Sequence, residues 1–505
     1  MSEPRNSVRI NLLANYVGQG WIAIMNLAFI PVYLSMLGID AYGLVGIFAI
    51  VVAGTSLLDA AVTPALNREM ARFRAGEQSP QSIADLLRSV ELVSGAFIGA
   101  VIAVGWLSAD WLTEHWLTKS PLSQTSVSQA LVLMSIVASS RVAEGIYRGA
   151  LFGLERHVLL NGTMIVLSTV RSGGAALALI WIAPTIQTFF IWQATASCAG
   201  LAVLAALTHR ALPKPPRRAA FSRSALAEIR NFSAGILGTA MLALLLTQGD
   251  KVLLAKILPL KLFAYYTLAT IISNALYQLI GPVAQSYYPR FTEITTRGAK
   301  GELATIYHQA AQVLTVAVAP AAMLLVFFSD QILLLWTGNH DVAEQAGPVL
   351  SLLAIGTLVH GLQHIPYMLQ LSRGWSSLAA RVNLAAMLIM FPTLLWLVPK
   401  YAGMGAAAIW LVLNVLCLVV TIHLMHRRVL KGEAGAWYRR DVISIVGAAA
   451  LPTLVSRLFW SASADLPLKI GLLVLTFAIA SIASLLAASE LRGRVLALAG
   501  YRHAL

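Results

Sequence analysis

Charged residues are scarce in this chain: Asp, Glu, Lys and Arg together make up 11% of its 505 residues. An ordinary globular domain carries about a quarter, so the composition excludes a water-soluble fold. Hydrophobic residues make up 58% of the sequence, and the mean hydropathy is +0.75. These values are typical of an integral membrane protein.

Cysteine is almost absent as well. Cys198 and Cys417 both lie in apolar runs, so no disulfide framework is expected. The motifs GxxxxGK[ST], HExxH, CxxC, GxSxG and GxGxxG are all missing, which excludes an ATP-driven pump unless a partner supplies the ATPase. No pattern points to a cofactor. The first apolar segment is too long for a cleavable signal peptide and is expected to remain as the first span.

Acidic residues are outnumbered, 22 to 36, which gives a formal net charge of +14. In a membrane protein this excess holds cytoplasmic loops in place, so nucleic-acid binding is not expected. With the N-terminus inside, most basic residues fall on inner loops. The outer side receives only Lys119, Lys256, Lys261, Lys400 and Lys469. This alternation predicts an even number of spans, with both termini cytoplasmic.

Apolar segments of about twenty residues are candidate spans, and the sequence predicts about fourteen of them in an all-α fold. The predicted spans are 9–36, 41–66, 87–108, 125–150, 158–182, 186–208, 230–256, 262–288, 307–329, 345–370, 380–398, 404–425, 442–461 and 467–489.

The connection after the sixth span, HRALPKPPRRAAFSRS, is rich in Pro and Arg and is typical of a linker between two lobes. YGL at 42–44 and YTL at 266–268 each precede a basic stretch, which fits a six-plus-six duplication. We therefore predict four parts: an N-terminal lobe 1–210, a cytoplasmic linker 211–229, a C-terminal lobe 230–430, and two further spans with a tail at 431–505.

Charged side chains inside the spans are the candidate functional residues, because each costs roughly 2.5–3.5 kcal/mol at mid-bilayer and should face a partner or a wet cavity. The basic ones are Arg141, Arg171, Lys251 and Arg457, and the acidic ones are Asp59, Glu144 and Asp250. Arg457 lies near the outer end of its span and is expected to snorkel to the interface.

Arg141, Glu144 and Arg148 lie at i, i+3 and i+7, on one helical face. We expect Glu144 to pair with Arg148, which leaves Arg141 to face an anion. Asp59 lies at a similar depth, so an Asp59–Arg141 pair is the alternative. Arg171 lies near the middle of its span and is expected to line the same cavity.

Polar residues at helical spacing mark the first span: Asn11, Asn15, Gln19 and Asn26. They either line the cavity or form hydrogen bonds between helices. Adjacent Asp250 and Lys251 are either a structural pair near a helix end or part of the cavity, where Asp250 would hold Lys251 charged or exchange a proton.

His360 and His364 have the i, i+4 spacing of a metal pair. No third ligand accompanies them in the sequence, so a metal site is not expected.

The runs PVYLSMLGIDAYGLVGIF, LDAAVTPALNREMARFRAGE, RGALFGLERHVLLN, TQGDKVLLAKILPLKLFAYYTLA and YYPRFTEI resemble the oligosaccharide-lipid (O-antigen) flippases of the polysaccharide biosynthesis family, within the multidrug/oligosaccharidyl-lipid/polysaccharide exporter superfamily. The resemblance implies two six-helix lobes in a V plus two C-terminal helices, located in the bacterial cytoplasmic membrane.

The implied substrate is an undecaprenyl-diphosphate-linked oligosaccharide, moved from the inner to the outer leaflet by alternating access. Its diphosphate and sugars would occupy a cationic cavity, for which Arg141, Arg171, Lys251, Asn15, Gln19 and Asn26 are candidates. Asp59, Glu144 and Asp250 are candidates for ion coupling. The implied partners are the lipid bilayer and the polysaccharide polymerase machinery.

Three alternatives remain. A drug or metabolite antiporter of the same superfamily shares the lobes, but a cavity for cations favours acidic residues. A lipid II flippase is a near neighbour, although the quoted runs resemble the polysaccharide branch more closely. A membrane glycosyltransferase or ligase would need a long external catalytic loop, and the longest external stretches are short and amphipathic, so an enzyme is not expected.

Overall fold

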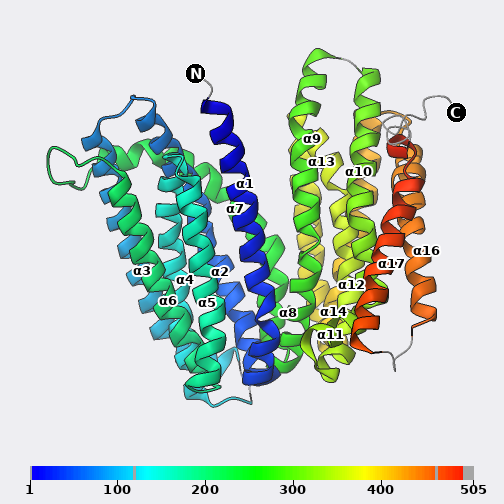
Figure 1. The fold of residues 1–505 in the computed structure, drawn as a ribbon, viewed down its shortest axis with the longest axis horizontal. Coiled ribbons are helices and arrows are strands. Elements are labelled where there is room, and N and C mark those ends of the chain that lie inside the picture. The colour runs from blue at the N-terminus through cyan, green and yellow to red at the C-terminus, as the bar shows by residue number, and fades with distance from the viewer. Residues whose placement is uncertain (1–2, 118–120, 299, 461–464, 493–505) are drawn as a thin grey trace. The chain divides into compact units, whose positions relative to one another are not determined.

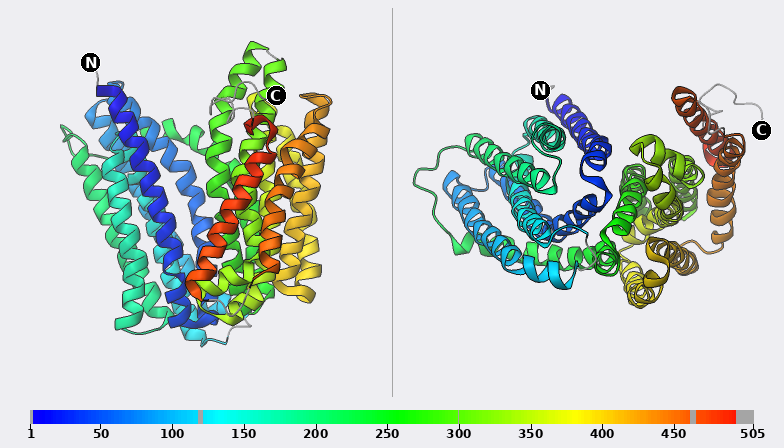
Figure 2. Two further views of the ribbon diagram at one scale, coloured as in Figure 1. Left: turned by 45° about the vertical axis from the view of Figure 1, so that its right-hand side comes forward. Right: turned by 90° about the horizontal axis from the view of Figure 1, so that it is seen from below.

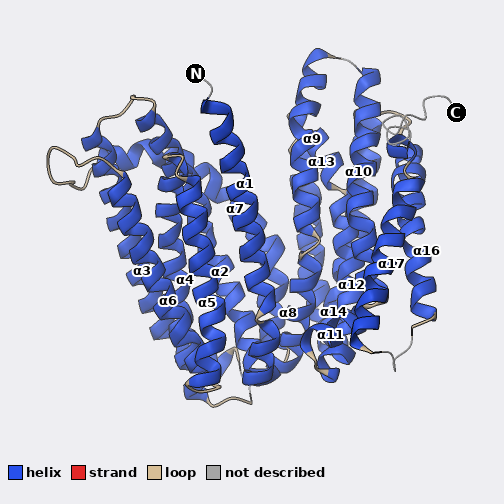
Figure 3. Cartoon of the chain, in the orientation of Figure 1, coloured by secondary structure: helices blue, strands red, loops and turns tan. Residues whose placement is uncertain are grey.

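The computed structural model describes residues 3–117, 121–298, 300–460 and 465–492. Most of the chain in these ranges is helical, and no strand occurs in them (Figure 3). Among the described residues, eleven helices are long and apolar enough to cross a membrane by length and composition. The prediction of an all-α membrane protein is therefore confirmed.

The chain divides into two compact units, Met1–Ala264 and Tyr265–Leu505. Unit 1 contains seven long helices in its described part (Figure 1). They are α1 (Glu3–Ala28), α2 (Ile30–Arg74), α3 (Pro80–His115), α4 (Gln124–Gly153), α5 (His157–Trp181), α6 (Ile186–Ala211) and α7 (Arg223–Ile257). The predicted linker 211–229 is inside unit 1, and its non-helical part is 212–222.

Helix α8 (Leu260–Asn274) leads into unit 2. The remaining helices are α9 (Tyr277–Arg297), α10 (Lys300–Phe327), α11 (Ser329–Thr337), α12 (His340–Leu362), α13 (His364–Ser372), α14 (Ser377–Arg428), α15 (Ala434–Ala436), the π-helix η1 (Trp437–Ile443), α16 (Ser444–Leu458) and α17 (Leu466–Ala487). The last two predicted spans correspond to α16 and α17, which pack against each other and against α10 (Figure 2).

Serine and threonine caps define where four helices of unit 1 begin. The side chains of Ser79, Ser123, Thr185 and Ser222 each accept a hydrogen bond from the backbone N–H three residues later, at 3.1–3.3 Å. Each cap satisfies one of the N–H groups that have no partner inside the helix. The starts of α3, α4, α6 and α7 are therefore encoded locally.

Three predicted spans differ from the helices that form. The segment predicted at 9–36 breaks at Phe29, since Pro31 has no N–H to donate to the carbonyl four residues earlier. Positive φ at Gly38 (77°) breaks α2 again, in a region that favours glycine. The predicted spans 262–288 and 345–370 are each divided in two, into α8 with α9 and α12 with α13.

Helix α14 combines two predicted spans, 380–398 and 404–425. Its 52 residues would extend about 78 Å at 1.5 Å per residue, far more than a hydrocarbon core of about 30 Å requires. The backbone leaves the helical conformation at Ala402, where φ is 48° and ψ is −134°. The two predicted spans therefore correspond to the two helical stretches on either side of Ala402.

A surface ion pair joins the end of α2 to the connection between α4 and α5. Arg74 Nη1 lies 2.6 Å from Glu155 Oε1, and the backbone of Glu155 has a positive φ of 54°. The hydrogen bond from Arg74 lowers the pKa of the Glu155 carboxyl. This pair contributes its stability above the unfolded-state pKa and loses it as pH falls through the folded-state value.

Glycines on α4 bring its backbone against α2. A methyl group added at Gly149 would lie 2.6 Å from the Thr63 carbonyl oxygen, and one at Gly153 would lie 2.7 Å from Met70 Cβ. Gly145, one turn earlier, faces Asp59 and Thr63 in the same way. Small residues at i, i+4 and i+8 permit this close approach of two membrane helices.

Replacing Gly149 by Ala should lower the melting temperature in detergent, because the backbone of α2 must move to admit the methyl group. Gly162 on α5 is the matched control: it is exposed, and an added methyl group would meet no atom within 4 Å. Gly162→Ala should leave the melting temperature unchanged or raise it slightly. Equal effects of the two substitutions would contradict the close-packing interpretation.

Candidate functional site

A charged cavity lies inside unit 1, among α2, α4 and α5, which run side by side in Figure 1. Its volume is about 210 Å³, or roughly seven water molecules at about 30 Å³ each. Five of its lining residues carry charge. The described residues that line it are Val52, Thr55, Asp59, Arg141, Val142, Glu144, Arg148, Met164 and Arg171.

The inner part of the cavity holds a buried ion pair. Arg171 Nη2 donates to Glu144 Oε1, and the two side chains are 10% and 3% exposed. Gly200 on α6 makes room for them, since a methyl group there would lie 2.9 Å from Arg171 Nη2. The predicted Glu144–Arg148 pair is therefore wrong. Glu144 forms its ion pair with Arg171 on α5, and not with Arg148, one turn away on α4.

A second ion pair in the cavity is more exposed to solvent. Arg148 Nη2 lies 2.7 Å from Asp59 Oδ2, with the side chains 35% and 25% exposed. Thr63 Oγ1 lies 2.5 Å from the other oxygen of Asp59, so both carboxylate oxygens are engaged. The alternative Asp59–Arg141 pair is also wrong, because Asp59 is paired with the arginine two turns further along α4.

Arg141 has no carboxylate within 4.0 Å among the described residues. Its Nη2 lies 3.3 Å from Gln193 Oε1 on α6, and its guanidinium lies 5.2 Å from the centroid of the Phe48 ring. The amide oxygen of Gln193 and the ring of Phe48 both interact favourably with a cation, but neither carries a charge that would neutralise it. Three guanidinium groups and two carboxylates thus leave the cavity with one excess positive charge.

Each of the three arginines also presents a donor that the protein does not use. The Nε atoms of Arg141, Arg148 and Arg171 are buried and have no hydrogen-bond partner. Guanidinium donors match the oxygens of phosphate and carboxylate groups. The chemistry of the cavity therefore favours a small, oxygen-rich anion.

Asn15, Gln19 and Asn26 on α1 are not among the described residues that line this cavity. Asn15 Oδ1 accepts a hydrogen bond of 2.6 Å from Asn161 on α5, as the interhelical interpretation predicts. Gln19 and Asn26 are exposed, and the side chain of Asn11 lies outside the described residues. A substrate role for Asn15, Gln19 and Asn26 stays a prediction.

Asp250 and Lys251 lie on α7 and are not among the lining residues. Lys251 Nζ lies 2.6 Å from the Thr247 carbonyl oxygen and 3.3 Å from Asp250 Oδ1, so the two charges form a pair. Their roles in substrate binding and ion coupling stay predictions. Arg457 lies 2.7 Å from Asp330 in unit 2, and its expected snorkelling to the interface stays a prediction.

His360 and His364 both line a cavity of unit 2. The Tyr277 hydroxyl lies 2.9 Å from His360 Nδ1, and the two imidazole centroids are 5.2 Å apart. Within the described ranges, no group of three or more His, Cys, Asp or Glu residues is arranged to hold a metal ion.

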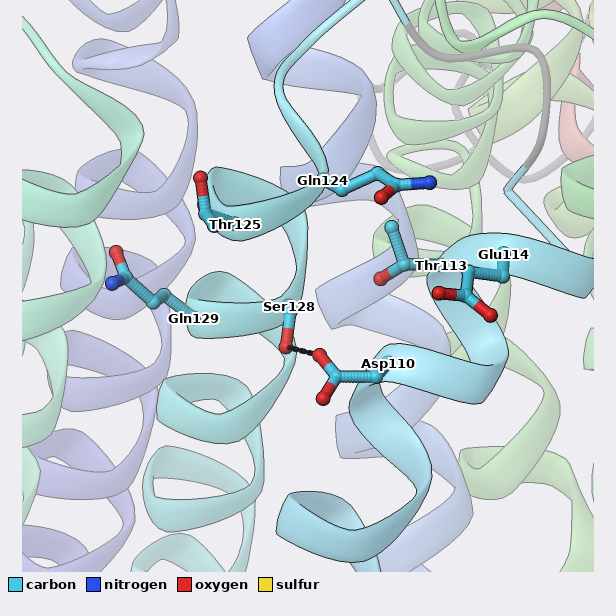
Figure 4. Close-up of a pocket in the computed structure, with 7 residues that line it drawn as sticks. All are labelled: Asp110, Thr113, Glu114, Gln124, Thr125, Ser128 and Gln129. Carbon is cyan, nitrogen blue, oxygen red and sulfur yellow. Dashed lines mark hydrogen bonds between the residues drawn. The ribbon is translucent and has the colours of Figure 1, made fainter.

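A further cavity, of about 370 Å³, lies between the end of α3 and the start of α4 (Figure 4). Among the described residues that line it, the charged ones are Asp110 and Glu114, and Ser128 donates a hydrogen bond of 2.6 Å to Asp110. Carboxylates repel an anion, so these two residues do not favour the binding of a phosphate.

Two features of the charged cavity were missed from the sequence. Gln193 is buried and contacts both Arg141 and the backbone of Arg171, and nothing in the local sequence distinguishes it. The glycines at 145, 149 and 153 could have been found, because small residues every four positions on an apolar helix indicate a helix–helix contact.

Comparison with known protein families gives two matches. A family described as "Polysaccharide biosynthesis protein" matches residues 8–295, and the family "MatE" matches residues 263–396. The first match covers more than half of the chain and includes all five charged residues of the cavity. In sequence, the chain matches none of the curated proteins with which it was compared.

Solved structures similar to this chain are membrane transporters. Lipid II flippase MurJ in an inward closed conformation aligns with a TM-score of 0.69 at 12% identity, covering 97% of this chain and 99% of that one. An inward-facing MATE family multidrug resistance transporter aligns at 0.65 and 14% identity, over 83% and 96%. A Vibrio cholerae MATE transporter, VcmN, aligns at 0.55 and 15%, over 87% and 100%. The chain thus has the fold of these transporters.

Proposed function

Because this chain belongs to the polysaccharide biosynthesis protein family, we propose that it flips an undecaprenyl-diphosphate-linked oligosaccharide from the inner to the outer leaflet of the bacterial cytoplasmic membrane. The observation that carries the proposal is Arg141, a cation without a carboxylate partner among the described residues, in a cavity with excess positive charge. A neutral or cationic substrate gives no reason to keep such a charge inside a membrane protein, where desolvation makes it costly.

A diphosphate cannot cross about 30 Å of hydrocarbon unaided, because its charges lose their hydration. Guanidinium donors replace that hydration with charge-assisted hydrogen bonds. Arg141 would contact the diphosphate first, since Arg148 and Arg171 are already held by Asp59 and Glu144. The lipid tail would remain in the bilayer, and alternating access would expose the cavity to each leaflet in turn.

Ion coupling is part of the proposal. Asp59 is the more exposed of the two cavity carboxylates, so it is the one that can exchange a proton with water when a substrate phosphate draws Arg148 away. Glu144 is nearly dry and, on this proposal, serves to neutralise Arg171. Both termini would be cytoplasmic, as the distribution of basic residues predicts.

The MatE match over residues 263–396 favours a second candidate, a drug or metabolite antiporter. The charge of the cavity separates the two functions. A cationic drug requires excess negative charge, whereas this cavity has excess positive charge. A lipid II flippase also carries a diphosphate, so only the glycan distinguishes that substrate from the proposed one.

Deletion of the gene followed by lipid analysis tests the proposal. We expect undecaprenyl-diphosphate-linked oligosaccharide to accumulate on the inner leaflet and surface polysaccharide to be lost, with the polymerase machinery starved of substrate. Expression of the intact chain should restore both. Unchanged lipids together with increased sensitivity to cationic dyes would reject the flippase and support the antiporter.

A further inference from the structure

We propose that unit 2 contains a separate pocket that binds an uncharged, hydroxyl-rich group, namely a sugar residue of the substrate. This inference rests on the proposed function, because the sugar is part of the lipid-linked oligosaccharide named there. The pocket has a volume of about 230 Å³ and lies among α12, α13 and α14. Its lining is His360, Gln363, His364, Tyr367, Gln370, Ala379, Val382, Asn383 and Thr421.

Gln370 indicates a ligand most directly. Its side chain is 0% exposed and lines the pocket, yet neither its amide nitrogen nor its amide oxygen has a hydrogen-bond partner. A buried amide with both groups unsatisfied costs free energy, and such groups are found where a ligand completes the site. A sugar hydroxyl can donate to the amide oxygen and accept from the amide nitrogen.

The break between α12 and α13 places two imidazoles in the same pocket. Pro366 cannot donate to the carbonyl of Leu362 and so interrupts the helix at Gln363. His364 Nδ1 lies 3.2 Å from the carbonyl oxygens of both His360 and Gly361. Because carbonyls only accept, Nδ1 carries the proton and Nε2 presents a lone pair. His364 thus adds a hydrogen-bond acceptor to the lining.

The lining favours a neutral ligand. Among the described residues that line it there is no Lys, Arg, Asp or Glu, in contrast to the charged cavity of unit 1. The lining offers amide, imidazole and hydroxyl groups, together with the partly exposed aromatic ring of Tyr367. A sugar has hydroxyls that can form hydrogen bonds with the polar groups and apolar C–H faces that can pack on the ring. The volume equals about eight water molecules at roughly 30 Å³ each, which suits a single sugar ring.

Replacing Gln370 by Leu tests the pocket, since leucine keeps the volume and removes both amide groups. Binding to the full-length protein in lipid nanodiscs would be measured for two probes. One is the lipid-linked oligosaccharide extracted from the deletion strain, and the other is undecaprenyl diphosphate without glycan. We expect Q370L to weaken binding of the first about tenfold and to leave binding of the second unchanged.

Thermal unfolding separates a binding role from a structural one. Q370L should leave the melting temperature unchanged or raise it, because it removes two unsatisfied buried groups. Gln312 is the matched control in the same unit: it is 1% exposed, but its amide donates to Asp441 at 2.9 Å and accepts from the Glu490 backbone at 2.9 Å. Q312L should lower the melting temperature.

Two results would overturn the inference while the proposed function stands: equal affinity of the wild type for both probes, or unchanged affinity of Q370L for the glycan-bearing lipid. A lowered melting temperature of Q370L with equal weakening of both probes would show a structural role and overturn it too. If the wild type binds neither lipid, the proposed function fails, and the sugar pocket with it.

Discussion

Replacing Glu144 by Gln should strongly destabilise unit 1. The substitution leaves the Arg171 guanidinium without its carboxylate in a site where the two side chains are only 10% and 3% exposed. Breaking a buried ion pair by removing one partner costs about 3–5 kcal/mol. We expect the melting temperature in detergent to fall markedly, and the yield of folded protein to fall with it.

A double substitution gives the internal control. Glu144→Gln combined with Arg171→Gln removes both charges at once, so it should recover much of the lost stability. Asp59→Asn provides a second comparison, because it breaks the Arg148 pair at a site 25–35% exposed. Partly exposed pairs contribute less, about 1 kcal/mol or below at the surface. A Glu144 variant as stable as the Asp59 variant would refute the buried-pair account.

Replacing Arg141 by Gln should have the opposite signature: loss of function with the fold retained. The guanidinium has no carboxylate partner among the described residues, so its removal leaves no negative charge without a partner. A hydrogen bond to a charged group contributes about 1.5–3 kcal/mol. Binding of undecaprenyl diphosphate should therefore weaken roughly 10- to 100-fold, and the variant should fail to complement a deletion strain.

Arg74→Gln is the matched control for Arg141→Gln. It removes one positive charge from the same unit, but Arg74 lies at the exposed end of α2 and outside the cavity. We expect its lipid binding to equal that of the wild type. Arg141→Lys keeps the charge and loses the forked donors, so its affinity should be intermediate. Wild-type binding by Arg141→Gln would remove the main support for an anionic substrate.

The membrane class and the existence of nearly every helix follow from the sequence, because apolar length and N-terminal caps are local signals. The breaks between consecutive helices are harder to predict from the sequence. Pro31 and Pro366 mark two of them, but the turn between Asn274 and Tyr277 contains neither proline nor glycine. The sequence therefore carries no local signal for that break.

The charged residues of the cavity were also predictable, since isolated charges in apolar spans are conspicuous. Their partners were not. Helical spacing on α4 suggested Glu144 with Arg148, but the structure pairs Glu144 with α5 and Arg148 with α2. Pairing between helices depends on how each is rotated about its axis. The packing glycines determine that rotation for α2 and α4, and only the structure reveals it.

The glycine contact between α4 and α2 also limits how this protein can work. Because the backbones of α4 and α2 are this close at Gly149 and Thr63, we expect the two helices to move together. The backbone positions that carry Asp59 and Arg148, one on each helix, should therefore keep their spacing during transport, and only the two side chains would move apart. On the proposed function, the site for the anion is therefore preassembled, and the movement that carries the substrate across must move α2 and α4 together.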